Sequence, residues 1–243
     1  MECKRTFVRE IFRIFMRIFT EASQNVCTPF VFCTTPYVTM PKPTTSFQSL
    51  ISSSIQASIA TKERLLAECA EAIGAAGNLL ASTLENSGKI LLCGNGGSAA
   101  DAQHIAAELV IRYRSGVNRR ALPALALTVD PSMLTAGAND LGYDAVFARG
   151  VEALGRKGDA LIAITTSGNS PSVMRAAEAA KAQGISVIGL LGCGGGKMLS
   201  LCDMAVIVPS TVTARIQESH ILVGHIWCEM IEETLFPDLF PAA

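Results

Sequence analysis

The chain has 243 residues, of which 49% are hydrophobic and 17% are charged, so an intrinsically disordered chain is excluded. Its 20 Lys and Arg residues and 21 Asp and Glu residues give a net charge of -1, without the basic excess typical of nucleic-acid-binding proteins. No apolar run approaches the roughly 18 to 20 residues of a membrane-spanning helix. We therefore expect neither nucleic acid nor a membrane as a partner.

Residues 1–45 differ in composition from the rest of the chain. Five basic residues are spread among Phe and Ile between Met1 and Thr20, and a Pro- and Thr-rich stretch follows from Cys27 to Thr45. A basic amphipathic start is typical of a transit peptide or a membrane-surface helix. We favour a simpler interpretation, in which this segment is extra sequence, disordered or translated from an early start codon, and Met40 begins the protein proper. Residues 46–243 then form one domain.

Apolar residues from Phe47 to Leu84 recur at mostly helical spacing. Gly74 and Gly77 weaken the middle of this pattern, which predicts two helices or one broken helix. Because the segment precedes the first strand, we expect it to pack outside the sheet or against a partner subunit.

From Lys89 onward, short apolar runs alternate with helical patterns. The predicted strands are Lys89–Cys93, Ala124–Val129, Ala160–Thr165, Ser186–Leu191 and Met204–Val208. The predicted helices are Ala99–Tyr113, Ser132–Ala138, Asp144–Leu154, Pro171–Gln183, Lys197–Leu201 and Ala214–Leu235. This alternation indicates an α/β fold, with a five-stranded parallel sheet flanked by helices and preceded by the amino-terminal helical segment. Ligands then bind at the carboxyl ends of the strands.

The first such loop is Gly94–Asp101, of sequence GNGGSAAD. Its glycines allow the backbone to approach a ligand, and Ser98 is placed to cap the next helix, whose amino end attracts anions. The loop matches neither the dinucleotide-binding fingerprint nor a P-loop. A glycine-rich turn without a ligand is the alternative.

A second loop, Thr165–Pro171, carries four hydroxyl side chains around Gly168 and places Pro171 in the first turn of a helix. Hydroxyls and free backbone N–H groups at a helix start form a phosphate cradle without a basic residue. A capping loop without a ligand is the alternative.

Asn139 and Asp140 follow the short helix that is predicted to end at Ala138. Polar side chains in this place can bind sugar hydroxyls, and a plain turn is the alternative.

The three histidines supply the remaining chemistry. His104 and Glu108 are four residues apart on one predicted helix and so share a face. On the last helix, His225 lies roughly 80° from Gln217 and His220 roughly 60° in the opposite direction, so helical geometry does not choose between them. A set of His, Glu, Gln and His would give zinc four N and O ligands. Alternatively, His104 contributes only packing and Glu108 is a solvated helix charge.

These motifs, in this order, resemble those of the phosphoheptose isomerases, which are sedoheptulose 7-phosphate isomerases of the sugar-isomerase (SIS) fold. The resemblance covers about residues 50 to 236 and rests on Gly94–His104 with Glu108, Leu134–Ala136, Asn139–Tyr143, Gly158–Asp159, Thr165–Ser170, Arg215–His220 and Gly224–His225. It implies a flavodoxin-like three-layer sandwich. The residue at 165 is Thr where a serine is commoner, so the hydroxyl is retained.

The resemblance also implies an activity and roles for individual residues. Sedoheptulose 7-phosphate would be isomerised to D-glycero-D-manno-heptose 7-phosphate through an enediol, toward lipopolysaccharide core or related glycans. Glu108 and His225 match the acid/base pair, and His220 matches a structural or supporting position. His104, Glu108, Gln217 and His225 match the site of one Zn²⁺ per subunit. The positions that match substrate-binding residues are Asn95, Gly96, Gly97, Glu108, Asn139, Asp140, Thr165, Thr166, Ser167, Ser170 and Gln217.

The same resemblance implies a cytoplasmic homotetramer with active sites at subunit interfaces. None of the eight cysteines forms a CxxC pair, and Cys93 and Cys228 read as buried thiols, which agrees with a reducing compartment. Two non-catalytic alternatives belong to the same fold: a protein that binds the replication initiator, and a sensor of phosphosugars. The presence of both Glu108 and His225 favours the enzyme.

Overall fold

The computed structural model describes residues 47–240, so the prediction for residues 1–45 lies outside the described residues. Five strands form one parallel sheet: β1 Ile90–Gly94, β2 Ala124–Ala126, β3 Ala160–Thr165, β4 Ser186–Leu191 and β5 Met204–Ile207. Their order in the sheet is β2-β1-β3-β4-β5. The predicted fold class is confirmed, although β2 ends at Ala126 and not at Val129.

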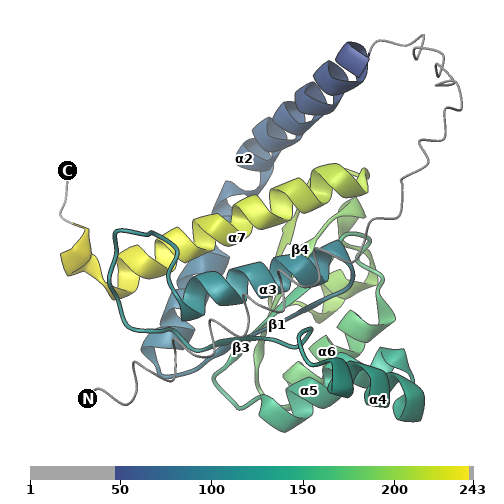
Figure 1. The fold of residues 1–243 in the computed structure, drawn as a ribbon, viewed down its shortest axis with the longest axis vertical. Coiled ribbons are helices and arrows are strands. Elements are labelled where there is room, and N and C mark those ends of the chain that lie inside the picture. Colours follow the sequence, from purple (N-terminus) through teal and green to yellow (C-terminus); the bar gives the residue numbers. More distant parts are fainter. Residues whose placement is uncertain (1–46, 241–243) are drawn as a thin grey trace, which may run out of the picture. The chain divides into compact units, whose positions relative to one another are not determined.

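Helices cover both faces of the sheet (Figure 1). They are α2 Phe47–Glu85, α3 Gly97–Val110, α4 Pro131–Leu141, α5 Val146–Leu154, α6 Pro171–Ala182 and α7 Thr213–Leu235, with 3₁₀ turns at Tyr143–Ala145, Cys193–Leu201 and Pro237–Leu239. Alternate residues of β3 face the two layers. Ile162 packs with α2, α3 and α7, whereas Leu161 packs with α5 and α6. The sheet is therefore the middle layer of three.

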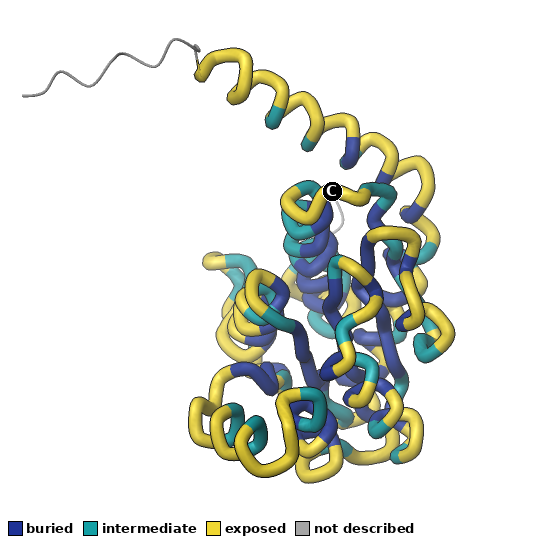
Figure 2. Tube along the Cα trace, turned by 90° about the vertical axis from the view of Figure 1, so that its right-hand side faces the viewer, coloured by how far each residue is buried: buried dark blue, intermediate teal, exposed yellow. Residues whose placement is uncertain are grey.

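The amino-terminal segment is one continuous helix of 39 residues, so the prediction of two helices or a broken helix is wrong. Gly77 lies within α2 on the face that packs against α7. A Cβ at this position would lie 2.6 Å from the sulfur of Met230 on α7, so glycine lets the two helices approach closely. The first half of α2 is exposed, as Figure 2 shows, and carries Phe47, Leu50, Ile51, Ile55 and Ile59.

Two further helix boundaries differ from the prediction. Helix α3 begins at Gly97 with Gly96 as its N-cap, so Ser98 is a buried residue of the first turn and caps nothing. Helix α4 continues to Leu141, so Asn139 and Asp140 lie on its last turn and not in a loop after it. No helix between residues 47 and 240 has the length and apolarity needed to cross a membrane.

Candidate active site

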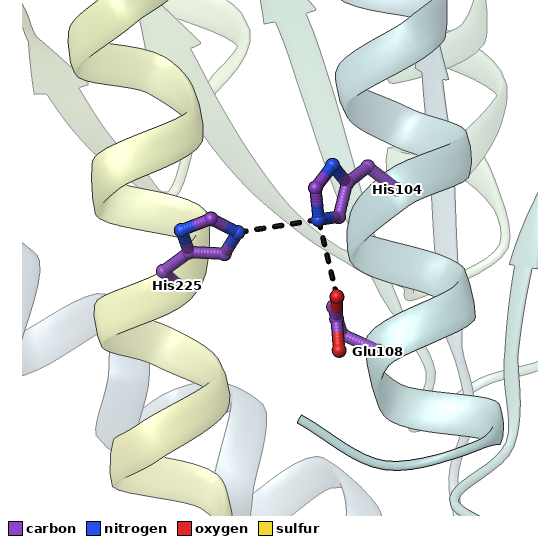
Figure 3. A group of neighbouring side chains, drawn as sticks. All are labelled: His104, Glu108 and His225. Atoms are coloured by element: carbon purple, nitrogen blue, oxygen red, sulfur yellow. Dashed lines mark hydrogen bonds and ion pairs between the residues drawn. The ribbon is translucent and has the colours of Figure 1, made fainter. Parts of the chain in front are cut away.

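Helices α3 and α7 lie side by side and bring three titratable side chains together (Figure 3). The Nε2 atom of His104 is 3.1 Å from Oε1 of Glu108, one turn further along α3. The Nε2 atom of His225, on α7, is 3.3 Å from the same His104 nitrogen. One ligand-type atom from each residue lies within 4.8 Å of the other two. The pair on α3 is thus completed by a histidine that lies 121 positions after His104 in the chain.

This cluster has the atoms that a divalent metal ion requires. Two imidazole nitrogens and one carboxylate oxygen are a typical set of protein ligands for Zn²⁺, with a further position for another ligand. The side chain of His104 is 48% exposed and that of Glu108 is 24% exposed, so an ion or a substrate can reach them. The residues present therefore fit the predicted metal.

Gln217, the fourth predicted ligand, lies two turns before His225 on α7 and is half-buried. Its side-chain amide packs against Gly97, at the start of α3, so closely that a Cβ at position 97 would overlap the amide nitrogen. A side chain at position 97 would therefore displace the amide of Gln217. The amide lies where the first loop enters α3.

The structure shows which of the two histidines on α7 belongs to the cluster, a choice that helical geometry alone left open. His220 is fully buried, and its Nε2 lies 3.0 Å from the carbonyl oxygen of Leu191 at the end of β4. Burial lowers the pKa of His220 to about 4, because the charged imidazolium would lose its hydration, and the hydrogen bond to Leu191 offsets this only in part. His220 is thus a neutral core residue, whereas His225 faces His104.

The loops after β1 and β3 meet through the side chain of Asn95. Its Nδ2 donates to the hydroxyls of Ser170 at 2.8 Å and Ser172 at 3.0 Å, across the start of α6. The chain runs from β1 outward to β2 and returns to β3 on the other side of β1, so these loops flank the switch point where open α/β sheets bind ligands. The two predicted binding loops therefore form one region.

The second loop has the features of an anion cradle. Pro171 occupies the first turn of α6, and Ser170 is its N-cap residue but makes no side-chain capping bond. The Ser170 hydroxyl accepts from Asn95, so its own hydrogen is left for Ser172 or a ligand. The Thr165 and Ser167 hydroxyls lie 3.4 Å apart. Hydroxyls thus gather at a helix amino terminus, which favours a phosphate.

Asn139 and Asp140 are exposed, and the amide of Asn139 donates to the carboxylate of Asp140 at 2.7 Å. The described contacts do not join them to the cluster or to Asn95, so their role in substrate binding stays a prediction.

Sequence reasoning assigned no role to Tyr143 or Asp101. The Tyr143 hydroxyl donates to Oδ1 of Asn95 at 2.7 Å, which fixes the amide from the side opposite Ser170. Burial raises the pKa of Asp101 to about 6, and nearby His104 opposes that rise. Asp101 lies three residues before His104 on α3, a spacing that was available as a signal.

Comparisons with known proteins identify the family of the chain. The SIS domain family matches residues 55–192. A phosphoheptose isomerase of Pelodictyon phaeoclathratiforme is 52% identical over 192 residues, which cover 79% of this chain and 91% of that protein. Another, from Nitratiruptor, is 60% identical over 151 residues, covering 62% and 80%. The solved phosphoheptose isomerase of Neisseria gonorrhoeae superposes with a TM-score of 0.73 at 44% identity, covering 77% of this chain and 100% of that one.

Proposed function

The chain belongs to the phosphoheptose isomerases of the SIS-domain family, and we propose that it converts sedoheptulose 7-phosphate to D-glycero-D-manno-heptose 7-phosphate. One observation carries the proposal: a carboxylate and two imidazoles gather on α3 and α7, and α3 starts from the glycine-rich loop whose Asn95 binds the hydroxyl-rich loop. Such an aldose–ketose isomerisation moves a proton between C1 and C2, and so needs a base at the carbon and an acid at the carbonyl oxygen.

Substrate binding falls to the strand-end loops in this proposal. The hydroxyls at the start of α6 hold the phosphate, and the first loop and the end of α4 hold the sugar. The residues are Asn95–Gly97, Asn139, Asp140, Thr165–Ser167, Ser170 and Gln217. A cradle without Lys or Arg holds the phosphate through hydrogen bonds and the helix amino terminus, which suits a product that must leave.

Proton transfer falls to the α3–α7 cluster. The Glu108 carboxylate takes the proton from the carbon, and His225 serves the oxygen as it becomes a hydroxyl. Support comes from the position of both groups around the His104 nitrogen, which lets them act on neighbouring atoms of one substrate. General acid–base steps of this kind contribute about 10² to 10⁴-fold each.

The proposal includes one Zn²⁺ per subunit, held by His104, Glu108, Gln217 and His225. When bound, the ion would supply Lewis-acid polarisation of the substrate carbonyl. A carboxylate that binds a metal is a weaker base, so Glu108 must exchange between the two roles. Metal analysis of His104→Ala should show less zinc than the parent protein, and unchanged stoichiometry would remove His104 from the site.

The proposed assembly is a cytoplasmic homotetramer with active sites at subunit interfaces. The exposed apolar side chains in the first half of α2 support it, because a helix face of this kind is typical of a buried subunit contact. Light scattering at micromolar concentration should give four times the chain mass of 25.6 kDa, and a monomer would contradict the assembly.

The decisive experiment is incubation of the purified protein with sedoheptulose 7-phosphate. Formation of the heptose 7-phosphate supports the isomerase. Binding without turnover would indicate a phosphosugar sensor, and neither binding nor turnover would leave the protein-binding alternative.

A further inference from the structure

A buried ion pair joins the end of α3 to helix α7, and neither of its residues is among the proposed site residues. Arg119, in the segment between α3 and β2, places its Nε 2.8 Å from Oε1 of Glu232 on α7, and both side chains are fully buried. Removing two charges from water is costly unless hydrogen bonds compensate, and here the Oε1 atom of Glu232 and the guanidinium are bonded whereas Oε2 of Glu232 is buried without a hydrogen-bond partner among the described residues. The other bonds of this pair therefore indicate what it holds together.

Two further donors of Arg119 cap the end of α3, and Nη1 also donates to the carbonyl oxygen of Arg120. Nη2 of Arg119 donates to the carbonyl oxygen of Glu108 at 2.8 Å, and its Nη1 donates to that of Leu109 at 2.9 Å. The last carbonyls of a helix have no partner within the helix, and α3 has no basic residue in its last turn and Ile111, not a glycine, at its C-cap. A guanidinium ten residues later in the chain supplies both the donors and the positive charge that favours this end.

Glu232 connects the same guanidinium to the helix of His225. The two residues are seven positions apart on α7, and a heptad returns to within about 20° of the same face. Oε1 of Glu232 also accepts from the backbone N–H of Tyr113, whose ring centroid lies 5.4 Å from that of His225. The turn of α3 that carries Glu108 and the face of α7 that carries His225 are thus tied through one buried group.

We propose that Arg119 and Glu232 are positioning residues that fix the distance between Glu108 and His225, an inference that rests on the function proposed above. Neither side chain reaches the substrate. They act on the backbone that carries the base and on the helix that carries its partner. A misplacement of about 1 Å in a catalytic group can cost on the order of 10²-fold in rate.

The test replaces both charges at once, Arg119→Met with Glu232→Leu, so that no unpaired charge stays buried. We expect kcat for sedoheptulose 7-phosphate to fall about 10- to 10²-fold, on the scale of a displaced catalytic group. KM should change less than about threefold, because the phosphate cradle lies on other elements. The affinity for Zn²⁺, measured by chelator competition, should fall about 10-fold or more, as for other supports of metal ligands.

The matched control is Arg114→Met with Glu233→Leu. This pair joins the same segment to the same helix, with 2.8 Å between Arg114 Nη2 and Glu233 Oε1, but it is partly exposed. The Arg114 guanidinium binds carboxylates of α7 and not the carbonyls of α3, so kcat and Zn²⁺ affinity should stay within about twofold of the parent protein. An equal loss in this control would overturn the proposal, as would a buried-pair variant with parental kcat and Zn²⁺ affinity.

Arg119→Lys decides the matter if the buried-pair variant does not fold. Lysine keeps Glu232 paired, but one ammonium group lacks the planar fork that reaches the two carbonyls and the carboxylate together. A folded Lys variant with lower kcat, weaker Zn²⁺ binding and unchanged KM supports positioning, and parental values of both would overturn it. A parent protein that binds Zn²⁺ without turnover would refute the proposed function. The positioning role of Arg119 and Glu232 would then be judged by the Zn²⁺ affinities of the variants alone.

Discussion

The two parts of the candidate site differ in how their polar groups are satisfied. In the strand-end loops, the Asn95 amide donates hydrogen bonds to the hydroxyls of Ser170 and Ser172, and its oxygen accepts one from Tyr143. In the cluster between α3 and α7, His104 meets Glu108 and His225 at an accessible surface. The loops are thus preorganised by their own hydrogen bonds, whereas the cluster presents ligand and proton-transfer atoms. Changes in the cluster should therefore act on kcat, and changes in the loops on KM.

The largest effect is expected from the cluster. Glu108→Gln keeps the size of the side chain but removes the base, and His225→Gln removes the acid while it leaves a polar atom. Each variant should lose at least about 10²-fold in kcat, up to the 10⁴-fold of a full general acid–base contribution. Binding of the substrate, followed by calorimetry, should weaken far less because the loops are unchanged.

His220→Gln is the control for His225→Gln, because both histidines lie on α7 and only His225 faces His104. Its kcat should stay near that of the parent protein. If Glu108→Gln turns over at the parental rate, the assignment of the base is wrong. If His220→Gln is as inactive as His225→Gln, the two histidines are coupled or the wrong one was chosen.

The second effect is on stability and concerns His220 itself. Its folded pKa of about 4 lies below the usual 6.5, so between these values the unfolded chain binds more protons than the folded one. The free energy of unfolding therefore has its full value, as far as His220 is concerned, above about pH 6.5, and it falls as the pH drops toward 4. Each pKa unit corresponds to about 1.4 kcal/mol, so the loss is about 3 kcal/mol.

Urea unfolding of the parent protein and of His220→Gln, at several pH values, measures this loss. The variant lacks the titrating group, so its free energy of unfolding should approach that of the parent, or exceed it, as the pH falls from 7 to 4. A difference between the two proteins that stays constant over this range would show that His220 is not held neutral by its burial.

Much of the fold was predictable from the sequence because buried parallel strands are continuous apolar runs. The strand Ala160–Thr165 has the same bounds in the prediction and in the structure. The continuity of α2 was not predictable, because Gly77 reads as a helix breaker until Met230 is seen packed against it. The end of α4 was missed for a similar reason, since Asn139 and Asp140 are turn formers by composition but form the last helical turn here.

The cluster was only half predictable. The spacing of His104 and Glu108 places them on one face, but the identity of their partner depends on how α7 packs. That packing buries His220 against Leu191 and turns His225 toward α3. Asn95 and Ser170 are 75 positions apart in the chain, and Arg119 and Glu232 are 113 positions apart. A local sequence pattern does not predict such contacts.

The smallest effect, and the one that tests the loops, is expected for Tyr143→Phe. The change removes the donor to Asn95 Oδ1 and keeps the ring. Tyr143 is 48% exposed, so water can replace the lost bond, and the cost should lie at the low end of the roughly 0.5 to 1.5 kcal/mol of a hydrogen bond. KM should then rise about two- to threefold at unchanged kcat in steady-state assays. Tyr113→Phe is the matched control, because that hydroxyl donates to Glu229, outside both loops, and its loss should leave KM unchanged. A fall in kcat for Tyr143→Phe without a rise in KM would contradict the division of roles between the loops and the cluster.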